Sequence, residues 1–189
     1  MHKPAPIIKA RNLTKKYATL KAVDDVNFQI EPGTCYGFLG PNGAGKTTVM
    51  RMIYCVTPLT SGVLEVNGEN VMENMSAVKR GIGVVTQDDS LDYDLNVINN
   101  LLVYARYYDL TRDQAVRRAN ELIEFFQLSE KRNENVRTLS GGMKRRLQIA
   151  SAFINKPSIL ILDEPSTGLD PQARHHVWAK CHELIEQGV

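Results

Sequence analysis

Residues 40 to 48, Gly-Pro-Asn-Gly-Ala-Gly-Lys-Thr-Thr, constrain the fold of this 189-residue chain more than any other segment. They match the phosphate-binding pattern G-x-x-x-x-G-K-[ST], whose glycines let backbone N–H groups surround phosphate oxygens. In this pattern Lys46 reaches the outer phosphates of a nucleotide, and Thr47 offers a hydroxyl group to Mg²⁺. The alternative is a chance match in a Gly-rich turn, which should arise roughly once in a hundred or fewer chains of this size.

The residues on either side favour a phosphate loop. Cys35–Leu39 is a short apolar run that suits a buried strand, and Lys46–Cys55 reads as a helix with apolar residues available for packing. A strand, a Gly-rich loop and a helix in succession form the arrangement that the motif requires, and the helix points its positive end at the anion. We therefore expect a nucleotide site made of Gly40, Pro41, Asn42, Gly43, Ala44, Gly45, Lys46, Thr47 and Thr48.

The composition excludes several classes of protein. The net charge of +2 gives no sign of a nucleic-acid partner, and a hydrophobic share of 43% is ordinary for a globular domain. No apolar run approaches the roughly 18 residues of a membrane helix, and the first six residues lack the apolar stretch of a secretory signal. Cys35, Cys55 and Cys181 are few and widely spaced, so we expect small packing residues in a reducing cytosol rather than redox chemistry or a metal site.

The first part of the chain reads as rich in strands. The runs that suit a strand cover residues 7–10, 26–30, 63–66 and 82–86, and the last of them closes at Gln87. Asn67-Gly68 is a tight hairpin signal between Val66 and the region of Val71.

From about residue 94 to residue 156 the pattern is helical. Apolar residues recur at helical spacing from Leu95 to Ala105, and a Thr111–Gln114 capping box begins a helix that reaches Phe126. Ser140 could cap a helix over residues 142–154, which stops before Pro157.

The last part of the chain returns to a strand and a helix. The continuous run Ile159–Leu162 fits a strand buried on both faces, as in a parallel sheet, and a helix runs from Pro171 to near Gly188. The whole pattern predicts an α/β fold, in which a phosphate-loop core carries an inserted helical segment.

Asp163 and Glu164 follow the predicted buried strand directly. Ligands of open α/β sheets sit at the carboxyl ends of strands. Asp163 can hold Mg²⁺ there, commonly through water, and Glu164 can polarise a water molecule aimed at the γ-phosphate. The alternative is a pair of surface acids before Pro165, but Lys46 upstream and four aliphatic residues before the pair favour the functional interpretation.

Leu139-Ser140-Gly141-Gly142-Met143 is a second glycine motif. A Ser cap with two glycines at a helix start makes an anion site, although a simple helix cap with a flexible turn explains part of the pattern. Three basic residues follow, at positions 144 to 146, and we interpret them as a solvated basic face.

These motifs together resemble the ATP-binding subunit of ABC transporters over essentially the whole chain. Gly40–Thr48 resembles the Walker A loop, Ile159–Glu164 the Walker B strand with its catalytic glutamate, and Leu139–Met143 the ABC signature, with Met143 in place of the usual Gln. Gln87 falls where the family has its Q-loop glutamine, and residues 166–170 resemble the D-loop. The strings LSGGMKRR and GLDPQAR are similar to the drug-resistance and nodulation-factor exporter type.

The resemblance implies a fold and its division. It implies a P-loop NTPase core of the RecA-like type with a mostly parallel sheet, an N-terminal antiparallel β subdomain and an inserted α-helical subdomain. Residues 1–87 and 157–189 would form the core with the β subdomain, and residues 88–156 the helical subdomain with the signature.

The resemblance also implies an ATPase that powers a membrane exporter from the cytoplasmic face of the membrane, with ATP and Mg²⁺ as cofactors. Two nucleotide domains would pair head to tail around ATP, and a transmembrane permease would be the second partner. Among the implied roles, Lys46 stabilises the transferred charge and Glu164 acts as the base. Thr47, Gln87 and Asp163 bind the metal, and Gln87 also has a catalytic role in sensing the metal and the water. Ser140, Gly141 and Gly142 of the other copy contact the γ-phosphate, and Tyr17 stacks on adenine. Tyr17 could instead be a core aromatic residue, and Met143 lies beyond the glycines, so its replacement should spare the phosphate contact.

The chain departs from the family pattern at two places. Residues 96–100 read Asn-Val-Ile-Asn-Asn, where such subunits often carry a Thr and a Glu, and this region follows the Q-loop, where the family contacts its membrane partner. In the family a further strand with a switch histidine begins where this chain stops, and none of His2, His175, His176 and His182 lies in that context. We therefore expect a C-terminally incomplete domain with poor stability and little activity alone.

Two other classes remain open at this point. A soluble ABC protein that acts on ribosomes or DNA usually has tandem nucleotide domains or a long coiled coil, and neither a second phosphate loop nor heptads appear here. The third class is a nucleotide-binding fragment that does not hydrolyse ATP.

Overall fold

The computed structural model describes residues 5–88 and 90–189, which divide into two compact units. Unit 1 comprises the chain up to Ile82 together with Ile185–Val189, and unit 2 comprises Gly83–Leu184. The phosphate loop lies in unit 1, whereas the acid pair and the second glycine motif lie in unit 2.

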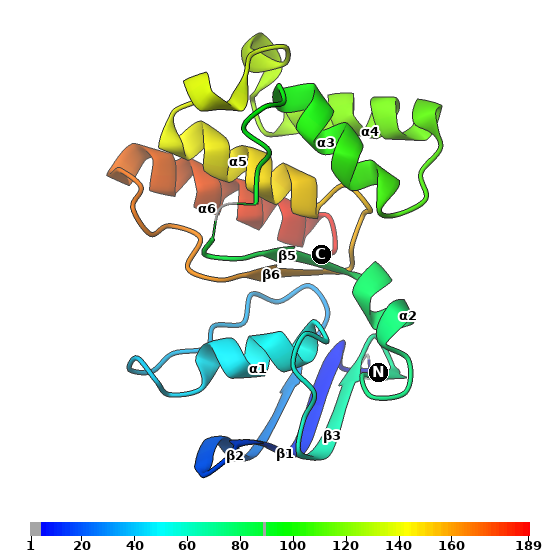
Figure 1. The fold of residues 1–189 in the computed structure, drawn as a ribbon, viewed down its shortest axis with the longest axis vertical. Coiled ribbons are helices and arrows are strands. Elements are labelled where there is room, and N and C mark those ends of the chain that lie inside the picture. The colour runs from blue at the N-terminus through cyan, green and yellow to red at the C-terminus, as the bar shows by residue number, and fades with distance from the viewer. Residues whose placement is uncertain (1–4, 89) are drawn as a thin grey trace. The chain divides into compact units, whose positions relative to one another are not determined.

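Unit 1 contains a four-stranded antiparallel sheet in the order β2-β1-β3-β4 (Figure 1). Its strands are β1 (Ile8–Tyr17), β2 (Leu20–Ile30), β3 (Ser61–Val66) and β4 (Glu69–Asn70). Alternating apolar residues of β1 and β3 are fully or almost fully buried, because successive side chains of a strand point to opposite faces; these residues are Ile8, Ala10, Leu64 and Val66. The expected N-terminal antiparallel sheet is therefore present.

The Asn67-Gly68 turn joins β3 to β4 as predicted. Both residues have a positive φ, 53° and 77°, and Val66 pairs with Glu69 across the turn. This is the backbone that a two-residue hairpin matching the twist of its strands requires. A further two-residue connection joins β1 to β2, where Tyr17 pairs with Leu20.

Two short helices complete unit 1. They are α1 (Lys46–Ile53), which contacts β2, and α2 (Met75–Arg80). Helix α1 begins at Lys46 as predicted and ends two residues before the predicted Cys55, and it buries Val49, Met52 and Ile53.

The predicted strand over Cys35–Leu39 is wrong. These residues have no regular secondary structure, and Leu39 is 94% exposed. A strand exists only where a neighbouring strand supplies hydrogen bonds, and none of the four strands of unit 1 pairs with this segment. The segment nevertheless keeps a strand-like alternation, because Tyr36 and Phe38 both pack on Phe28, with ring centres 6.2 and 5.4 Å away.

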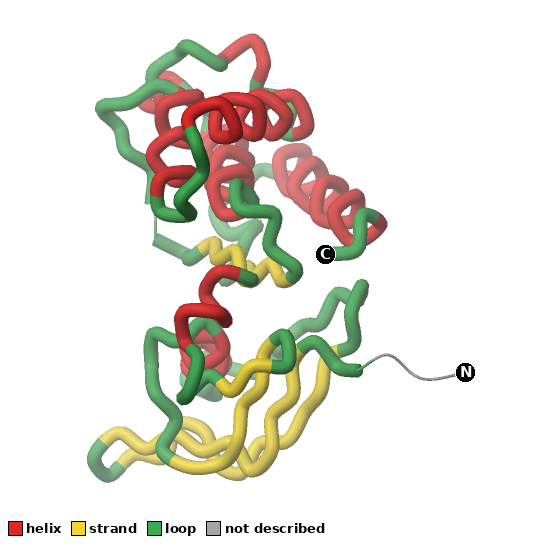
Figure 2. Tube along the Cα trace, turned by 90° about the vertical axis from the view of Figure 1, so that its right-hand side faces the viewer, coloured by secondary structure: helices red, strands yellow, loops and turns green. Residues whose placement is uncertain are grey.

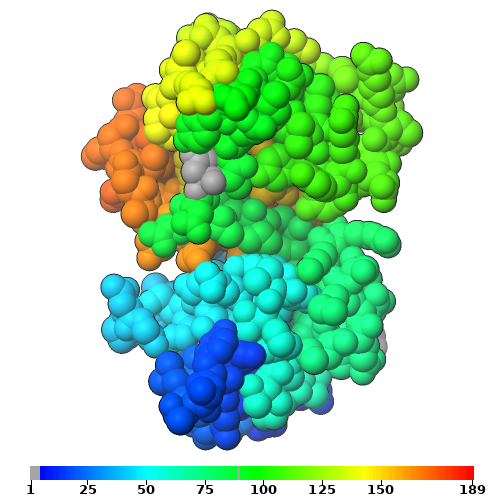
Figure 3. Space-filling model, in the orientation of Figure 1, coloured from blue at the N-terminus to red at the C-terminus, as the bar shows by residue number. Residues whose placement is uncertain are grey.

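Unit 2 places four helices on one side of a two-stranded parallel sheet (Figures 1 and 2). The strands are β5 (Ile82–Val85), which begins at the end of unit 1, and β6 (Ile159–Leu162). The helices are α3 (Val97–Arg106), α4 (Arg112–Phe125), α5 (Gly141–Ala152) and α6 (Pro171–Glu186), with single 3₁₀ turns at Ser129–Lys131 and Val136–Thr138. The atoms of α3 and α4, in green to yellow-green, form part of the face of this unit that the space-filling view shows (Figure 3).

The predicted caps of the helices are present. Thr111 and Gln114 form the capping box of α4, and the Ser140 hydroxyl accepts a hydrogen bond from Met143 N at 3.3 Å at the start of α5. The helices end within two residues of their predicted ends, because fraying and single tight turns blur such boundaries.

The prediction that the Ile159–Leu162 strand is buried on both faces is wrong for this unit. Only Ile159 and Ile161 are buried, whereas Leu160 and Leu162 are half-buried. The helices of unit 2 lie on one side of the sheet, so they cover only the side chains that point to that side.

The cysteines differ in their surroundings. Cys181 is buried and Cys55 is half-buried, which suits packing residues, but Cys35 is exposed. The packing prediction is therefore wrong for Cys35, since it lies in the same unpaired segment as Leu39. Burial raises the pKa of the Cys55 thiol.

Among residues 5–88 and 90–189, no helix combines the length and the apolar character needed to cross a membrane.

Candidate functional site

The phosphate loop owes its shape to its glycines. Gly43 and Gly45 have φ values of 82° and 87°, in the left-handed region that side chains disfavour. A Cβ atom on Gly45 would also overlap the carbonyl oxygen of Ala22 in β2, whereas one on Gly43 would meet nothing within 4 Å. Gly45 is thus needed both for the turn and for the close approach of α1 to β2.

Lys46 lies at the first position of α1 and folds back over the loop. Its Nζ donates hydrogen bonds to the carbonyl oxygens of Gly40 and Pro41, at 2.7 and 2.9 Å. Within the loop, the amide N–H of Ala44 donates to the Pro41 carbonyl at 3.2 Å, which closes a turn. Thr47, immediately after Lys46, is exposed at the positive end of the helix.

Tyr17 ends β1 and is not a core aromatic residue, since 44% of it is exposed. The Lys15 ammonium lies 4.9 Å from the centre of the Tyr17 ring and donates to the Pro58 carbonyl at 2.7 Å. One face of the ring is therefore occupied by a cation, while the residue as a whole stays accessible for stacking.

The acid pair and Gln87 lie at the same edge of the β5–β6 sheet. The amide N–H of Asp163 donates to the carbonyl of Val85 at 2.9 Å, so the two strands end side by side. Gln87 and Glu164 follow these ends within two residues and are exposed, and Asp163 is half-exposed. This is the edge at which α/β sheets bind ligands.

Glu164 has an unusual backbone. Its φ is +46°, a conformation that residues other than glycine rarely adopt. Its carboxylate accepts a hydrogen bond from the Thr167 hydroxyl at 2.9 Å, and its carbonyl accepts one from Thr167 N at 3.2 Å. Strained residues of this kind cluster at functional sites and persist only where their surroundings hold them.

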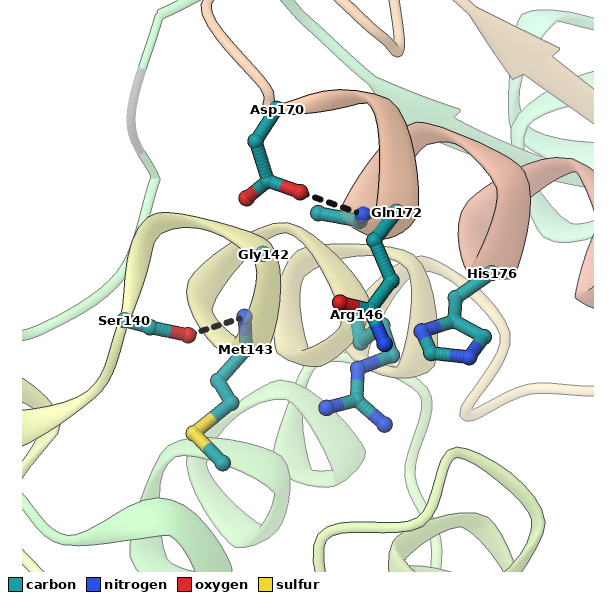
Figure 4. A pocket seen from close by; sticks show the side chains of 8 residues that line it. Ser140, Gly142, Met143, Arg146, Asp170, Gln172 and His176 are labelled. Carbon is teal, nitrogen blue, oxygen red and sulfur yellow. Dashed lines mark hydrogen bonds between the residues drawn. The ribbon is translucent and has the colours of Figure 1, made fainter.

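The second glycine motif forms the start of α5, where it faces α6 (Figure 4). Ser140 and Gly141 are exposed, and Leu139 is buried beneath them. A Cβ atom on Gly142 would lie 2.7 Å from the Cβ of Ala173, so this glycine also lets the two helices approach closely.

A shallow hollow of about 210 Å³ lies beside this glycine motif (Figure 4). Asp170 borders it and caps α6 by accepting the Ala173 amide N–H at 2.8 Å. The residues that line it are Ser140, Gly142, Met143, Arg146, Asp170, Gln172, Ala173 and His176.

The prediction of a solvated basic face at residues 144–146 is wrong. Arg145 is only 9% exposed. Arg146 donates to the carbonyls of Phe126 and Gln127 at 2.9 and 3.3 Å, and its burial lowers its pKa. The Lys144 ammonium lies 5.0 Å from the centre of the Tyr93 ring. The prediction fails because the three side chains lie against other segments of the chain and not in water. Arg145 and Arg146 bond backbone carbonyls of those segments, and Lys144 lies near Tyr93.

Arg145 is the residue of this site that sequence reasoning missed. Its guanidinium donates to three carbonyl oxygens, of Thr86 at 3.0 Å, Asp163 at 3.1 Å and Pro165 at 3.0 Å. It also donates to the Gln148 side chain at 2.9 Å. The available signal was its spacing, because Arg145 precedes the buried Ile149 by four residues and therefore lies on the inner face of its helix.

The departure at residues 96–100 has a structural explanation. Asn96 caps α3 by accepting the Asn99 amide N–H at 2.9 Å, so it retains the capping chemistry of a threonine. Asn100 is 1% exposed and is bonded to the backbone N–H and C=O of Asp92, at 2.9 and 3.0 Å. These asparagines tie Asp92 to α3 and cap the start of that helix.

Unit 2 thus brings together Gln87, Asp163 and Glu164, and links them to the helix that begins after Ser140. The phosphate loop and Tyr17 belong to unit 1, where they form a candidate site of their own.

A model of the ABC transporter family matches residues 23–167, which is more than half of the chain and includes the phosphate loop, the glycine motif and the acid pair. The chain belongs to the ABC transporter ATP-binding family.

Curated relatives of this family member include Nod factor export ATP-binding protein I of Cupriavidus metallidurans, with 45% identity over 96% of this chain and 60% of the relative. The protein of the same name from Burkholderia thailandensis is 45% identical over 94% of this chain and 59% of the relative. The chain therefore spans about 60% of the length of the curated relatives it matches.

Solved structures agree with the α/β fold. An ATP-binding subunit of an ABC transporter is 27% identical, with a TM-score of 0.83 over 97% of this chain and 76% of that one. The ATP-binding cassette MJ0796, dimeric and bound to ADP and Pi in a post-hydrolysis state, is 26% identical, with a TM-score of 0.83 over 95% of this chain and 83% of that one. The predicted P-loop NTPase fold of an ABC ATP-binding domain is confirmed.

Proposed function

We propose that this domain binds and hydrolyses ATP as part of a subunit that powers a membrane exporter. The observation that supports the proposal is the hydrogen bond from the Asp163 amide to the Val85 carbonyl, which joins the ends of β5 and β6, so the acid pair and Gln87 follow neighbouring strand ends. Ligands of α/β sheets bind at such an edge. The relatives at 45% identity are named as export ATP-binding proteins, which supports export as the process served.

In this proposal the phosphate loop binds the nucleotide through its backbone and Lys46. The Lys46 ammonium already lies against two loop carbonyls, so phosphate oxygens would compete with those carbonyls for it. A cation in this place stabilises charge on a transferred phosphoryl group. Tyr17, exposed at the end of β1, is the proposed stacking partner of adenine.

Mg²⁺ is the proposed metal, and the available donors suit it. Thr47 offers a hydroxyl, Gln87 an amide oxygen and Asp163 a carboxylate, and Mg²⁺ prefers oxygen ligands with several waters retained. The ion would neutralise charge on the phosphates. Within residues 5–88 and 90–189 no three His, Cys, Asp or Glu side chains form a cluster that could hold a metal.

Glu164 is the proposed general base. Its exposed carboxylate is oriented by the Thr167 hydroxyl and lies one residue beyond Asp163, so it can take a proton from a water molecule directed at the γ-phosphate.

We further propose that two copies pair head to tail and that a transmembrane permease is their partner at the cytoplasmic face of the membrane. Ser140 and Gly141 are exposed at the positive end of α5, which suits contact with the γ-phosphate held by a second copy. The solved relative that is dimeric supports the pairing. Residues 88–156 are the proposed helical subdomain that faces the permease, and no nucleic-acid partner is expected.

Turnover measured on the intact protein, with and without Glu164→Gln, tests the enzymatic part of the proposal. We expect turnover to fall by about 100-fold or more while ATP binding is retained, because only the base is lost. Unchanged turnover in the variant contradicts the assignment. Co-purification of the intact protein with a membrane protein, rather than with ribosomes or DNA, tests the partner.

A further inference from the structure

Arg145 lies at the centre of the unit 2 site. One buried guanidinium bonds the carbonyl that precedes Gln87 and the carbonyls on both sides of Glu164. We propose that Arg145 is a positioning residue that fixes Glu164 and Gln87 relative to the first turn of α5. This inference rests on the function proposed above and adds a coupling between the catalytic residues and the start of α5.

The chemistry of the side chain suits this task. A guanidinium presents five N–H donors in one rigid plane and stays charged, so it can bind several carbonyls that converge from different segments. Lysine offers three donors at one point and cannot span the same carbonyls. The acceptors come from the ends of β5 and β6, and Gln148, one turn along the same helix, accepts a further hydrogen bond at 2.9 Å.

The bonds to Asp163 and Pro165 explain how Glu164 keeps its strained backbone. Glu164 has a φ of +46°, and such a conformation relaxes unless neighbouring residues are held. Arg145 holds the carbonyl before it and the carbonyl after it. Without these anchors the turn would relax, and the carboxylate would leave the position from which it acts.

The position of Arg145 in α5 couples the glycines at the start of this helix to Glu164 and Gln87. It lies four residues beyond Gly141, and the first turn of the same helix presents the glycines proposed to bind the γ-phosphate held by the other copy. A short helix moves as a rigid body, so Arg145 moves whenever the first turn of α5 moves. The positions of Glu164 and Gln87 then change with it. In a head-to-tail pair, ATP at one site would therefore influence the base at the other site.

The test uses the full-length protein and compares Arg145→Lys with Arg117→Lys, an exposed arginine on α4. For Arg145→Lys we expect kcat to fall about 10- to 100-fold, because a misplaced base loses orientation. The KM and the affinity for a fluorescent ATP analogue should stay within about two-fold of the parent, since the phosphate loop is untouched. The Hill coefficient of ATP hydrolysis should fall toward that of independent sites, and Arg117→Lys should leave all four quantities unchanged.

A double-mutant cycle separates positioning from general stability. In a Glu164→Gln background, Arg145→Lys should change the residual turnover by less than about two-fold, because the group it positions has been removed. An equal loss of kcat in both backgrounds, or an unchanged kcat in the single variant, overturns the inference.

If Arg145→Lys does not fold, the kcat of Gln148→Leu tests the inference instead. This substitution removes the side-chain acceptor that orients the guanidinium toward the three carbonyls, so those bonds should loosen and kcat should fall about three- to ten-fold at unchanged ATP affinity. A parental kcat overturns the inference. A parent protein without turnover, or one whose turnover survives Glu164→Gln, contradicts the proposed function instead.

Discussion

Two cations anchor the candidate sites of the two units in different ways. Lys46 in unit 1 bonds the carbonyls of residues five and six positions before it in the sequence. Arg145 in unit 2 bonds carbonyls that are 59 residues before it and 18 and 20 residues after it. The loop is thus a local device, whereas the sheet edge is assembled from distant segments. We therefore expect the loop to tolerate change in the rest of the fold better than the sheet edge does.

The largest effect should come from Lys46→Ala, which tests whether the loop is local. Turnover should fall by about 100- to 1,000-fold through loss of charge stabilisation. The melting temperature should move by less than about 2 °C, because the freed carbonyls remain accessible to water. Lys79→Ala, an exposed lysine in α2, is the control and should keep parental turnover. A large drop in melting temperature for Lys46→Ala would contradict the idea that Lys46, unlike Arg145, holds only local structure.

Gly45→Ala compared with Gly43→Ala sharpens the description of the loop. Both positions have a positive φ, but only at Gly45 does a Cβ meet the Ala22 carbonyl. The free energy of unfolding should fall by about 2–4 kcal/mol for Gly45→Ala and by about 1–2 kcal/mol for Gly43→Ala. Denaturant unfolding of the full-length protein measures both values. Equal losses would mean that the contact with β2 is unimportant.

Gly142→Ala makes the corresponding test in unit 2, with a smaller expected effect. Its Cβ would lie 2.7 Å from the Ala173 Cβ, so overpacking should cost about 1–3 kcal/mol. Gly141→Ala, which meets nothing within 4 Å, should be neutral or stabilise the helix by about 0.5–1 kcal/mol.

Ala173→Gly added to Gly142→Ala separates the packing role of Gly142 from its proposed phosphate role. The double variant should recover stability, because the clash is relieved. If turnover stays low after stability returns, Gly142 also serves the ligand; if turnover returns with it, packing is its whole role. Failure to recover stability would contradict the packing explanation.

Local signals in the sequence were enough for the turns and the helix starts. Asn67-Gly68 formed its hairpin, Thr111 and Gln114 their capping box, and Ser140 its cap, because each depends on residues within a few positions. The order of the motifs along the chain was enough to predict the family.

Features that depend on distant neighbours were not predictable in this way. The apolar run Cys35–Leu39 suits a strand by composition, but a strand also needs a partner that composition cannot supply. The three basic residues after the glycine motif were likewise predicted from their charge to form a solvated face. Their role depends on the carbonyls of Thr86, Asp163 and Phe126, which approach only in the folded chain.

The unpaired segment Cys35–Leu39 has a practical consequence for handling the protein. It is uncharged and contains no proline, and Tyr36 and Leu39 are 48% and 94% exposed. Exposed segments of this kind add to one another between molecules and seed aggregates. The shelf life of a purified sample should therefore follow how well these five residues are covered, and a polar substitution at Leu39 is the first change to make when the sample precipitates.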